Sequence, residues 1–180
     1  MKKVLIVYSS WTGTTHEIAN EIGKVFQENS YKVDIIKADD PIYIEDYKAY
    51  IIGTSIHAGQ TVRSFRQFIK KNLDTLKNKP TALFVGCANM MNDTEKNRQE
   101  TLAWLNNAIS KYDSLKPISI GLFGGAFITE GIDFNNLNIL IRKMIVSMKK
   151  KIVEEQEKTD FRDWESIRGW AADLVTSISE

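Results

Sequence analysis

Hydroxyl-bearing residues crowd the stretch from Ser9 to Thr15, which reads SSWTGTT. Short Ser and Thr side chains, together with backbone N–H groups at a helix start, can converge on one phosphate, and the helix dipole favours its negative charge. Gly13 lets a ligand approach the backbone closely. The stretch contains no Lys and matches neither GxxxxGK[ST] nor GxGxxG, so a monophosphate fits better than a nucleoside triphosphate or a dinucleotide. A Ser/Thr-rich helix cap without a ligand is the alternative interpretation.

The elements that must position this stretch alternate between short apolar runs and amphipathic segments. The runs predict five strands, at Val4 to Tyr8, Tyr31 to Ile36, Ala49 to Ile52, Thr81 to Val85 and Ile118 to Phe123. Helical periodicity appears at Thr14 to Glu28, Val62 to Leu76 and Thr94 to Tyr112. The connection at Pro41 to Tyr47 has room for a turn or two of helix. Such alternation predicts an α/β fold, with a parallel sheet covered by helices on both faces.

A further helical segment interrupts this alternation after the fifth strand. Its apolar stripe comprises Leu137, Leu140, Ile141, Met144, Ile145, Met148 and Ile152, and it is flanked by Arg142, Lys143 and Lys149 to Lys151. In one interpretation the stripe packs on the domain while the lysines face water. In the other, the segment is a basic amphipathic element that meets anionic lipid, an acidic partner or an anionic substrate. A final helix at Asp163 to Ile178, with Asp163 as its N-cap, is expected to pack on the sheet.

Length and composition bound the functional classes. The 180 residues predict one domain over residues 1–180, and 43% hydrophobic with 26% charged residues excludes a disordered chain. A net charge of +1 gives no overall basic field for nucleic acid. The single Cys87 and the absence of a signal peptide or a spanning segment in the sequence predict a cytoplasmic protein.

The segment from Ile6 to Ile22, IVYSSWTGTTHEIANEI, resembles the phosphate-binding signature of the flavodoxin family. The resemblance implies FMN as the cofactor, with its phosphate held by Ser10, Thr12, Gly13, Thr14 and Thr15. It also implies a flavodoxin-like three-layer sandwich whose five parallel strands lie in the order 2-1-3-4-5, with an inserted helical segment after the fifth strand. In that order the cofactor lies at the switch point between the first and third strands.

The flavin ring is then expected across the loops that follow the third and fourth strands, at Thr54 to Gln60 and Gly86 to Asn92. Backbone amides there can bind its polar edge, while Trp11, Ile56 and Met90 can cover its faces. His57 is the candidate catalytic proton donor; an exposed histidine without a catalytic role is the alternative. Cys87 fits a packed apolar residue better than a redox thiol. The predicted ring site comprises Trp11, Ser55, Ile56, His57, Ala58, Gly59, Cys87, Ala88, Asn89, Met90 and Gly125.

A closer resemblance rests on IIGTSIHAGQTVRSFRQFIKKN, from Ile51 to Asn72, and TDFRDWESI, from Thr159 to Ile167. Both are similar to the menaquinone-dependent protoporphyrinogen oxidase family. That resemblance implies an FMN-dependent oxidoreductase that passes electrons from a porphyrinogen-like substrate to a quinone. It also implies a peripheral contact with the inner face of the cell membrane through Leu137 to Ile152.

Two other functional classes stay open. One is a flavodoxin that carries single electrons between redox-protein partners, and the other is an FMN-binding regulatory module. Carriers of the first kind resemble one another in being strongly acidic, whereas this chain is balanced at +1. The charge therefore favours the enzyme.

Overall fold

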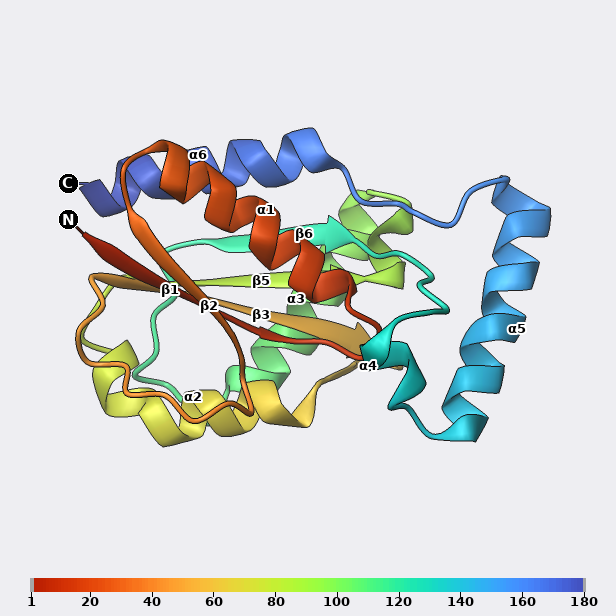
Figure 1. Cartoon of the computed structure of the whole chain (residues 1–180), viewed down its shortest axis with the longest axis horizontal. Helices are drawn as coiled ribbons and strands as arrows, with labels where there is room; N and C mark the ends of the chain where they lie inside the picture. The colour runs from red at the N-terminus through yellow and green to blue at the C-terminus, as the bar shows by residue number, and fades with distance from the viewer. Residues whose placement is uncertain (1, 180) are drawn as a thin grey trace.

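The computed structural model describes residues 2–179 and contains a twisted parallel sheet at its centre (Figure 1). The strand order is β2-β1-β3-β5-β6. Counted along the parallel strands this is 2-1-3-4-5, so the predicted order is confirmed. The strands are β1 (Lys3–Ser9), β2 (Lys32–Lys37), β3 (Ala49–His57), β5 (Thr81–Cys87) and β6 (Ile120–Gly124).

The three central strands owe their place to continuous apolar sequence. Residues Val4 to Val7 of β1 are fully buried, and all seven residues of β5 are buried. A strand with apolar residues on both faces is stable only between two covering layers. The strand β3 is longer than predicted, because Gly53 to His57 continue it beyond Ile52.

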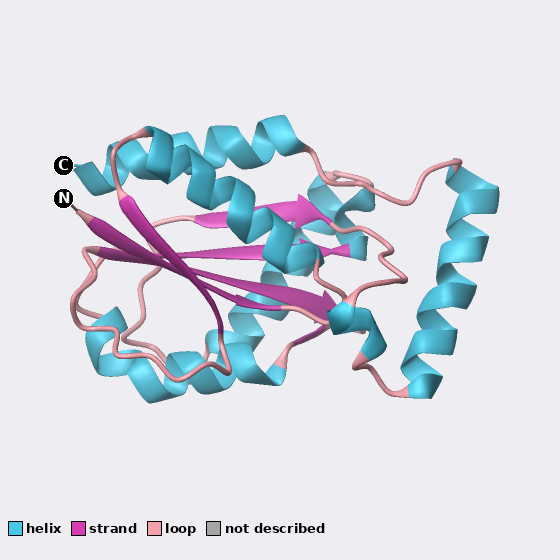
Figure 2. Cartoon of the chain, in the orientation of Figure 1, coloured by secondary structure: helices cyan, strands magenta, loops and turns pink. Residues whose placement is uncertain are grey.

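Two helix layers cover the sheet (Figure 2). Helices α1 (Thr14–Glu28) and α6 (Trp164–Ser179) pack on one face, where Ile18, Phe26 and Leu174 join the same buried cluster. Helices α2 (Arg63–Leu76) and α3 (Glu95–Ile109) cover the other face through Phe65, Ile69 and Leu105. The predicted three-layer sandwich is confirmed.

Local departures from the sequence prediction have simple causes. Part of the predicted loop at Thr54 to Gln60 is a hairpin, since β4 (Gln60–Thr61) pairs antiparallel with the end of β3. Its two turn residues, Ala58 and Gly59, have φ of 49° and 73°, as a two-residue turn with positive φ at both positions requires. The segment at Pro41 to Tyr47 forms turns rather than helix.

The segment after β6 forms a separate arm across the carboxyl ends of the strands. It contains α4 (Ile132–Asn135) and the long helix α5 (Ile139–Gln156), which stands away from the sheet in Figure 1. Within α5 only Ile145 is buried, while Leu140 is 72% and Met144 is 49% exposed. The apolar stripe therefore does not pack on the domain as a whole. No helix within residues 2–179 has both the length and the apolar composition to cross a membrane.

Candidate functional site

The loop between β1 and α1 folds around the side chain of Ser10. Its hydroxyl oxygen accepts hydrogen bonds from the backbone N–H groups of Gly13, at 3.0 Å, and Thr15, at 3.4 Å. Gly13 has a φ of 92° and directly precedes α1, a conformation that glycine adopts without steric cost. The loop thus gathers N–H donors at the positive end of a helix dipole, the arrangement that binds anions.

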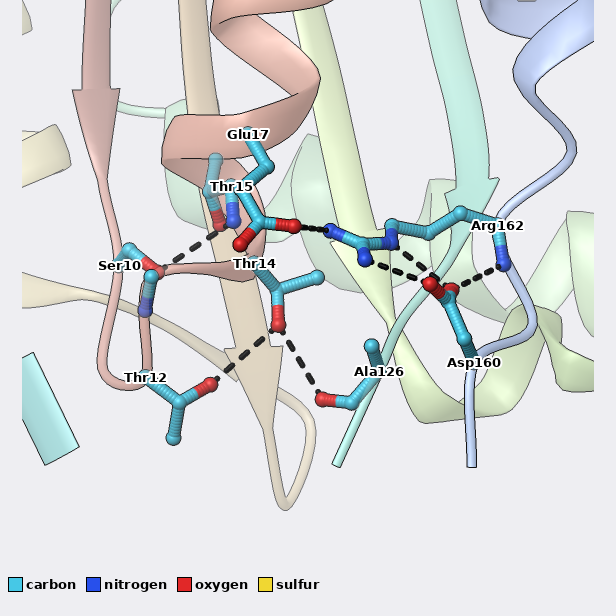
Figure 3. A network of polar contacts seen from close by, with 9 residues as sticks. Ser10, Thr12, Thr14, Thr15, Glu17, Ala126, Asp160 and Arg162 are labelled. Atoms are coloured by element: carbon cyan, nitrogen blue, oxygen red, sulfur yellow. Dashed lines mark hydrogen bonds and ion pairs between the residues drawn. The ribbon is translucent and has the colours of Figure 1, made fainter. Parts of the chain in front are cut away.

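The remaining hydroxyls of this loop complete the donor set. Thr12 and Thr14 place their hydroxyl oxygens 3.3 Å apart, and the Thr14 hydroxyl also donates to the Ala126 carbonyl at 3.1 Å (Figure 3). The Thr15 hydroxyl is fully buried and has no hydrogen-bond partner among the described residues. A buried, unpaired hydroxyl costs free energy unless a ligand satisfies it. Together, these neutral donors fit a phosphate group.

His57 lies beside the loop, at the end of β3. Its ring stacks on the indole of Trp11, with centroids 3.9 Å apart and planes inclined by 10°. The Nε2 atom lies 3.0 Å from the hydroxyl oxygen of Ser55. Burial lowers the pKa of His57 to about 4, so the ring is neutral at pH 7. A neutral imidazole can donate through one ring nitrogen and accept through the other.

The residues at and after the end of β5 fall into two groups. Cys87 is buried, burial raises the pKa of its thiol, and its sulfur lies 3.9 Å from the Thr101 hydroxyl. The 3-10 helix η1 (Ala88–Met91) turns Asn89 toward α3, where it donates to Asn97 and Thr101. Met90 is 3% exposed and belongs to the core. The structure therefore brings Cys87 and Ala88 to the site and directs Asn89 and Met90 away from it.

The arm supplies the opposite wall. Met144, Ile145 and Met148 of α5, with Phe127 from the segment after β6, face the sheet-end loops across one cavity. The cavity has a volume of about 90 Å³, smaller than the roughly 300–1,000 Å³ that is typical of sites enclosing a small molecule. These four apolar side chains are called the α5 wall below.

Most of the loops predicted to form the site do line this cavity, but some of the predicted residues in them do not. Nine predicted residues line it: Ser10, Thr12, Thr14, Ser55, Ile56, His57, Cys87, Ala88 and Gly125. Trp11, Gly13 and Thr15 lie in the adjoining loop, and Ala58 and Gly59 form the hairpin turn. Ala126, Phe127 and three residues of α5 also line the cavity and were not among the predicted site residues. The apolar stripe was a signal for the α5 residues, but it did not show which of them would face the cavity.

Charged groups frame the phosphate-binding loop. Lys37, at the end of β2, forms an ion pair with Asp133 of α4 at 3.0 Å, and this hydrogen bond raises the pKa of Lys37. Burial and the nearby Asp133 both raise the pKa of Tyr8 at the end of β1. Asp133 also lies close to the backbone of Gly13, since a Cβ built there would be 3.7 Å from its Oδ2 atom. A second acid at Gly13 would therefore face a like charge.

The side chains around this site are mostly neutral polar and apolar groups. Across residues 2–179 no three His, Cys, Asp or Glu side chains come together as they would around a metal ion. The groups that the cavity offers are hydroxyls, backbone N–H groups, one neutral imidazole and an apolar wall. Such a set suits an organic ligand with a phosphate and a flat ring system.

Comparisons with known proteins agree with this geometry. A protoporphyrinogen IX dehydrogenase [quinone] of Escherichia coli strain K12 is 23% identical over 176 residues, covering 96% of this chain and 94% of its own. A protein of the same name from Leishmania major is 26% identical over 182 residues, covering 96% and 74%.

Solved structures show the same fold. A flavodoxin from Streptococcus pneumoniae superposes with a TM-score of 0.55 at 12% identity, over 97% of this chain and 99% of its own. A flavoprotein of Lactobacillus acidophilus, crystallised in complex with FMN, has a TM-score of 0.50 at 18% identity, over 68% of this chain and 93% of its own. The flavodoxin-domain family model matches residues 5–160. The chain accordingly belongs to the flavodoxin-domain family.

Proposed function

We propose that this protein is an FMN-dependent oxidoreductase that passes electrons from a reduced, porphyrinogen-like substrate to a quinone. The observation that carries the proposal is the cavity between the phosphate-binding loop and the α5 wall. A protein that only passes electrons to other proteins has no need of an arm that adds an apolar wall beside the flavin site. The names of the Escherichia coli and Leishmania major relatives support the same activity.

The loop after β1 holds the FMN phosphate. The N–H groups of Gly13 and Thr15 now converge on the Ser10 hydroxyl, and the start of α1 adds its dipole. The Thr15 hydroxyl has no partner among the described residues, and we expect it to turn toward the phosphate as a further donor. When bound, FMN supplies a ring that takes up a pair of electrons and releases them singly or as a pair.

The residues at the ends of β3 and β5 orient the ring. Ser55, Ile56 and His57 line one part of the cavity, and Cys87 and Ala88 line another. His57 is neutral at pH 7 because burial lowers its pKa to about 4. Its role in this proposal is to hold a proton in a hydrogen bond at the cavity edge and to keep Trp11 in place by stacking.

The α5 wall binds the second ring system and excludes water. Phe127, Met144 and Met148 present apolar surface to the cavity, and thioethers and aromatic rings pack well against flat, conjugated molecules. The exposed apolar residues of α5, including Leu140 and Val146, extend this surface outward. Together with the neighbouring lysines they suit a peripheral membrane contact, from which a quinone can reach the cavity.

The experiment is an anaerobic absorbance titration of the purified protein with FMN, followed by protoporphyrinogen with and without a menaquinone analogue. Bleaching of the flavin by the porphyrinogen, and its recovery with the quinone, is the expected result. A flavin that binds but ignores both compounds, and passes electrons to a flavodoxin-dependent enzyme, would identify a carrier instead.

A variant tests the position of the cofactor. Gly13→Asp places a side chain at a φ of 92° and a negative charge near Asp133, so FMN affinity should fall by at least about a hundredfold. Gly169→Asp adds the same charge on α6, where a new side chain meets nothing within 4 Å, and should bind FMN normally. Full FMN occupancy in Gly13→Asp would show that this loop does not bind the FMN phosphate.

A further inference from the structure

Both ends of the arm leave the body of the protein at one narrow place. The backbone of Phe127 donates to the Thr159 carbonyl at 2.9 Å, and Phe161 donates to the Gly125 carbonyl at 3.0 Å. Ala126 and Asp160 form an antiparallel bridge between them. Residues 125–127 and 159–161 are called the neck below. The neck sets the position of α5, because Ile145 is the one buried residue of that helix.

Arg162 follows the neck directly, and its side chain is only 6% exposed. Its guanidinium binds the Asp160 carboxylate through Nε at 2.8 Å and Nη2 at 2.6 Å. The third donor, Nη1, reaches Glu17 in the first turn of α1 at 2.5 Å (Figure 3). The planar guanidinium alone among side chains can hold two carboxylates in this fixed geometry.

A second link joins the same two parts of the molecule. The Thr14 hydroxyl donates to the Ala126 carbonyl, and Thr14 begins α1, one turn before Glu17. The neck is therefore fastened to the start of α1 at two points, through Thr14 and through Glu17 (Figure 3). Thr14 also belongs to the loop that surrounds Ser10, so a shift of the neck changes the position of that loop.

From these contacts we infer that Arg162 is a positioning residue, which clamps the neck of the arm to the start of α1 and so fixes the α5 wall relative to the phosphate-binding loop. The clamp itself follows from the contacts between described residues, whereas its effect on FMN rests on the proposed function. Arg162 does not line the cavity; it acts through Asp160, Ala126 and Thr14.

The chain offers a matched control. Arg168 of α6, like Arg162, binds two carboxylates, but both belong to α1: Glu21 at 2.7 Å and Glu28 at 2.7 Å. Arg168→Ala removes the same group from a link between α6 and α1, far along α1 from the neck. Any difference between Arg162→Ala and Arg168→Ala therefore reports the clamp rather than the loss of an arginine that pairs with α1.

Hydrogen exchange measured by mass spectrometry without added FMN tests the clamp itself. Arg162→Ala should raise exchange rates in residues 125–161 at least about tenfold, while Arg168→Ala leaves that segment as in the unaltered protein. Arg162→Lys keeps the charge but cannot bind two carboxylates with fixed geometry, and should raise the exchange rates by an intermediate amount. Glu17→Gln weakens only the link between Arg162 and α1, and should also raise exchange rates in the neck. Unchanged exchange in residues 125–161 of Arg162→Ala would overturn the inference.

FMN titration then tests the consequence for the loop. Arg162→Ala should bind FMN about tenfold more weakly than Arg168→Ala, and FMN should slow exchange in the neck of the unaltered protein. Equal FMN affinities in the two variants would overturn the effect on the loop. Failure of all proteins to bind FMN would instead contradict the proposed function and leave the exchange result standing.

Discussion

Thr15 is a buried residue whose hydroxyl has no partner among the described residues. Removing the hydroxyl while keeping the shape should therefore help the ligand-free fold. We expect Thr15→Val to raise the free energy of unfolding by about 1 kcal/mol without FMN and to weaken FMN binding about tenfold. Urea unfolding and FMN titration measure the two effects.

Thr101→Val provides the comparison for this prediction. Thr101 is also fully buried, but its hydroxyl accepts a hydrogen bond from Asn89 at 3.1 Å. The substitution removes this hydrogen bond and the contact between the hydroxyl and the Cys87 sulfur, so Thr101→Val should lower the free energy of unfolding. If Thr15→Val destabilises the ligand-free protein as much as Thr101→Val does, the Thr15 hydroxyl is not an unsatisfied donor in the ligand-free fold.

His57 makes stability depend on pH. Burial lowers its pKa to about 4 in the folded protein, whereas the unfolded chain keeps the ordinary value of about 6.5. Between these values the unfolded chain binds more protons, so the free energy of unfolding falls as the pH drops from about 6.5 to about 4. The loss from this group is about 3 kcal/mol at most.

Urea unfolding of the ligand-free protein at several pH values in this window measures the effect. His57→Gln should remove that part of the pH dependence, and His16→Gln, which changes the only other histidine, should retain it. If the free energy of unfolding depends on pH in the same way in the unaltered protein and in His57→Gln, the imidazole is not desolvated as the structure indicates.

Helix α5 is the element that separates this chain from a plain five-stranded sandwich. Its exposed apolar residues include Ile139, Leu140 and Val153, and its lysines lie among them. One of these, Lys149, donates to the Thr129 hydroxyl at 2.9 Å and so helps to hold the arm together. Lys151 lies 3.8 Å from Glu155 in an exposed ion pair, and Lys143 and Lys150 are available for an anionic surface.

Charge reversal on α5 tests the membrane contact. The triple variant Lys143→Glu, Lys150→Glu, Lys151→Glu should bind vesicles with anionic phosphatidylglycerol at least about tenfold more weakly than the unaltered protein. Lys70→Glu, Lys71→Glu, Lys96→Glu makes the same change in net charge on α2 and α3 and should bind as before. Equal loss in both variants would mean that only net charge matters.

Some helices and strands of this fold could be predicted from the sequence, and others could not. Continuous apolar runs predicted the five parallel strands, because burial on both faces leaves a local signal. The short β4, η1 and α4 left none, since two to four residues hold no period. The SSWTGTT stretch revealed the phosphate-binding loop through its residue types. The α5 wall and the neck depend on contacts between residues more than 30 positions apart, such as Ala126 with Asp160, and no local pattern encodes them.

At the scale of the whole molecule, the arm is attached to the body through adjacent backbone segments. Phe127 and Thr159 are hydrogen-bonded neighbours, so a two-residue Asn-Gly turn can replace residues 128–158 and close the neck as a hairpin. The sheet and its four covering helices lose no core strand by this change. We expect the shortened protein to fold and to bind FMN within about tenfold of the full chain.

The shortened protein separates cofactor binding from turnover. It keeps the loop around Ser10 and the Arg162 clamp but lacks Met144, Ile145 and Met148. Porphyrinogen oxidation and vesicle binding should therefore be lost while the flavin spectrum remains. Retained turnover with the quinone would show that the α5 wall is not part of the substrate site. Circular dichroism confirms that the body has folded.

The α5 wall has one further consequence. Met144 and Met148 both line the cavity and are 49% and 43% exposed, so peroxide can reach their sulfur atoms. Oxidation to the sulfoxide turns a flexible apolar side chain into a polar one. Storage in air can thus make the wall hydrophilic without any change in sequence or fold, and methionine sulfoxide reductases would restore it.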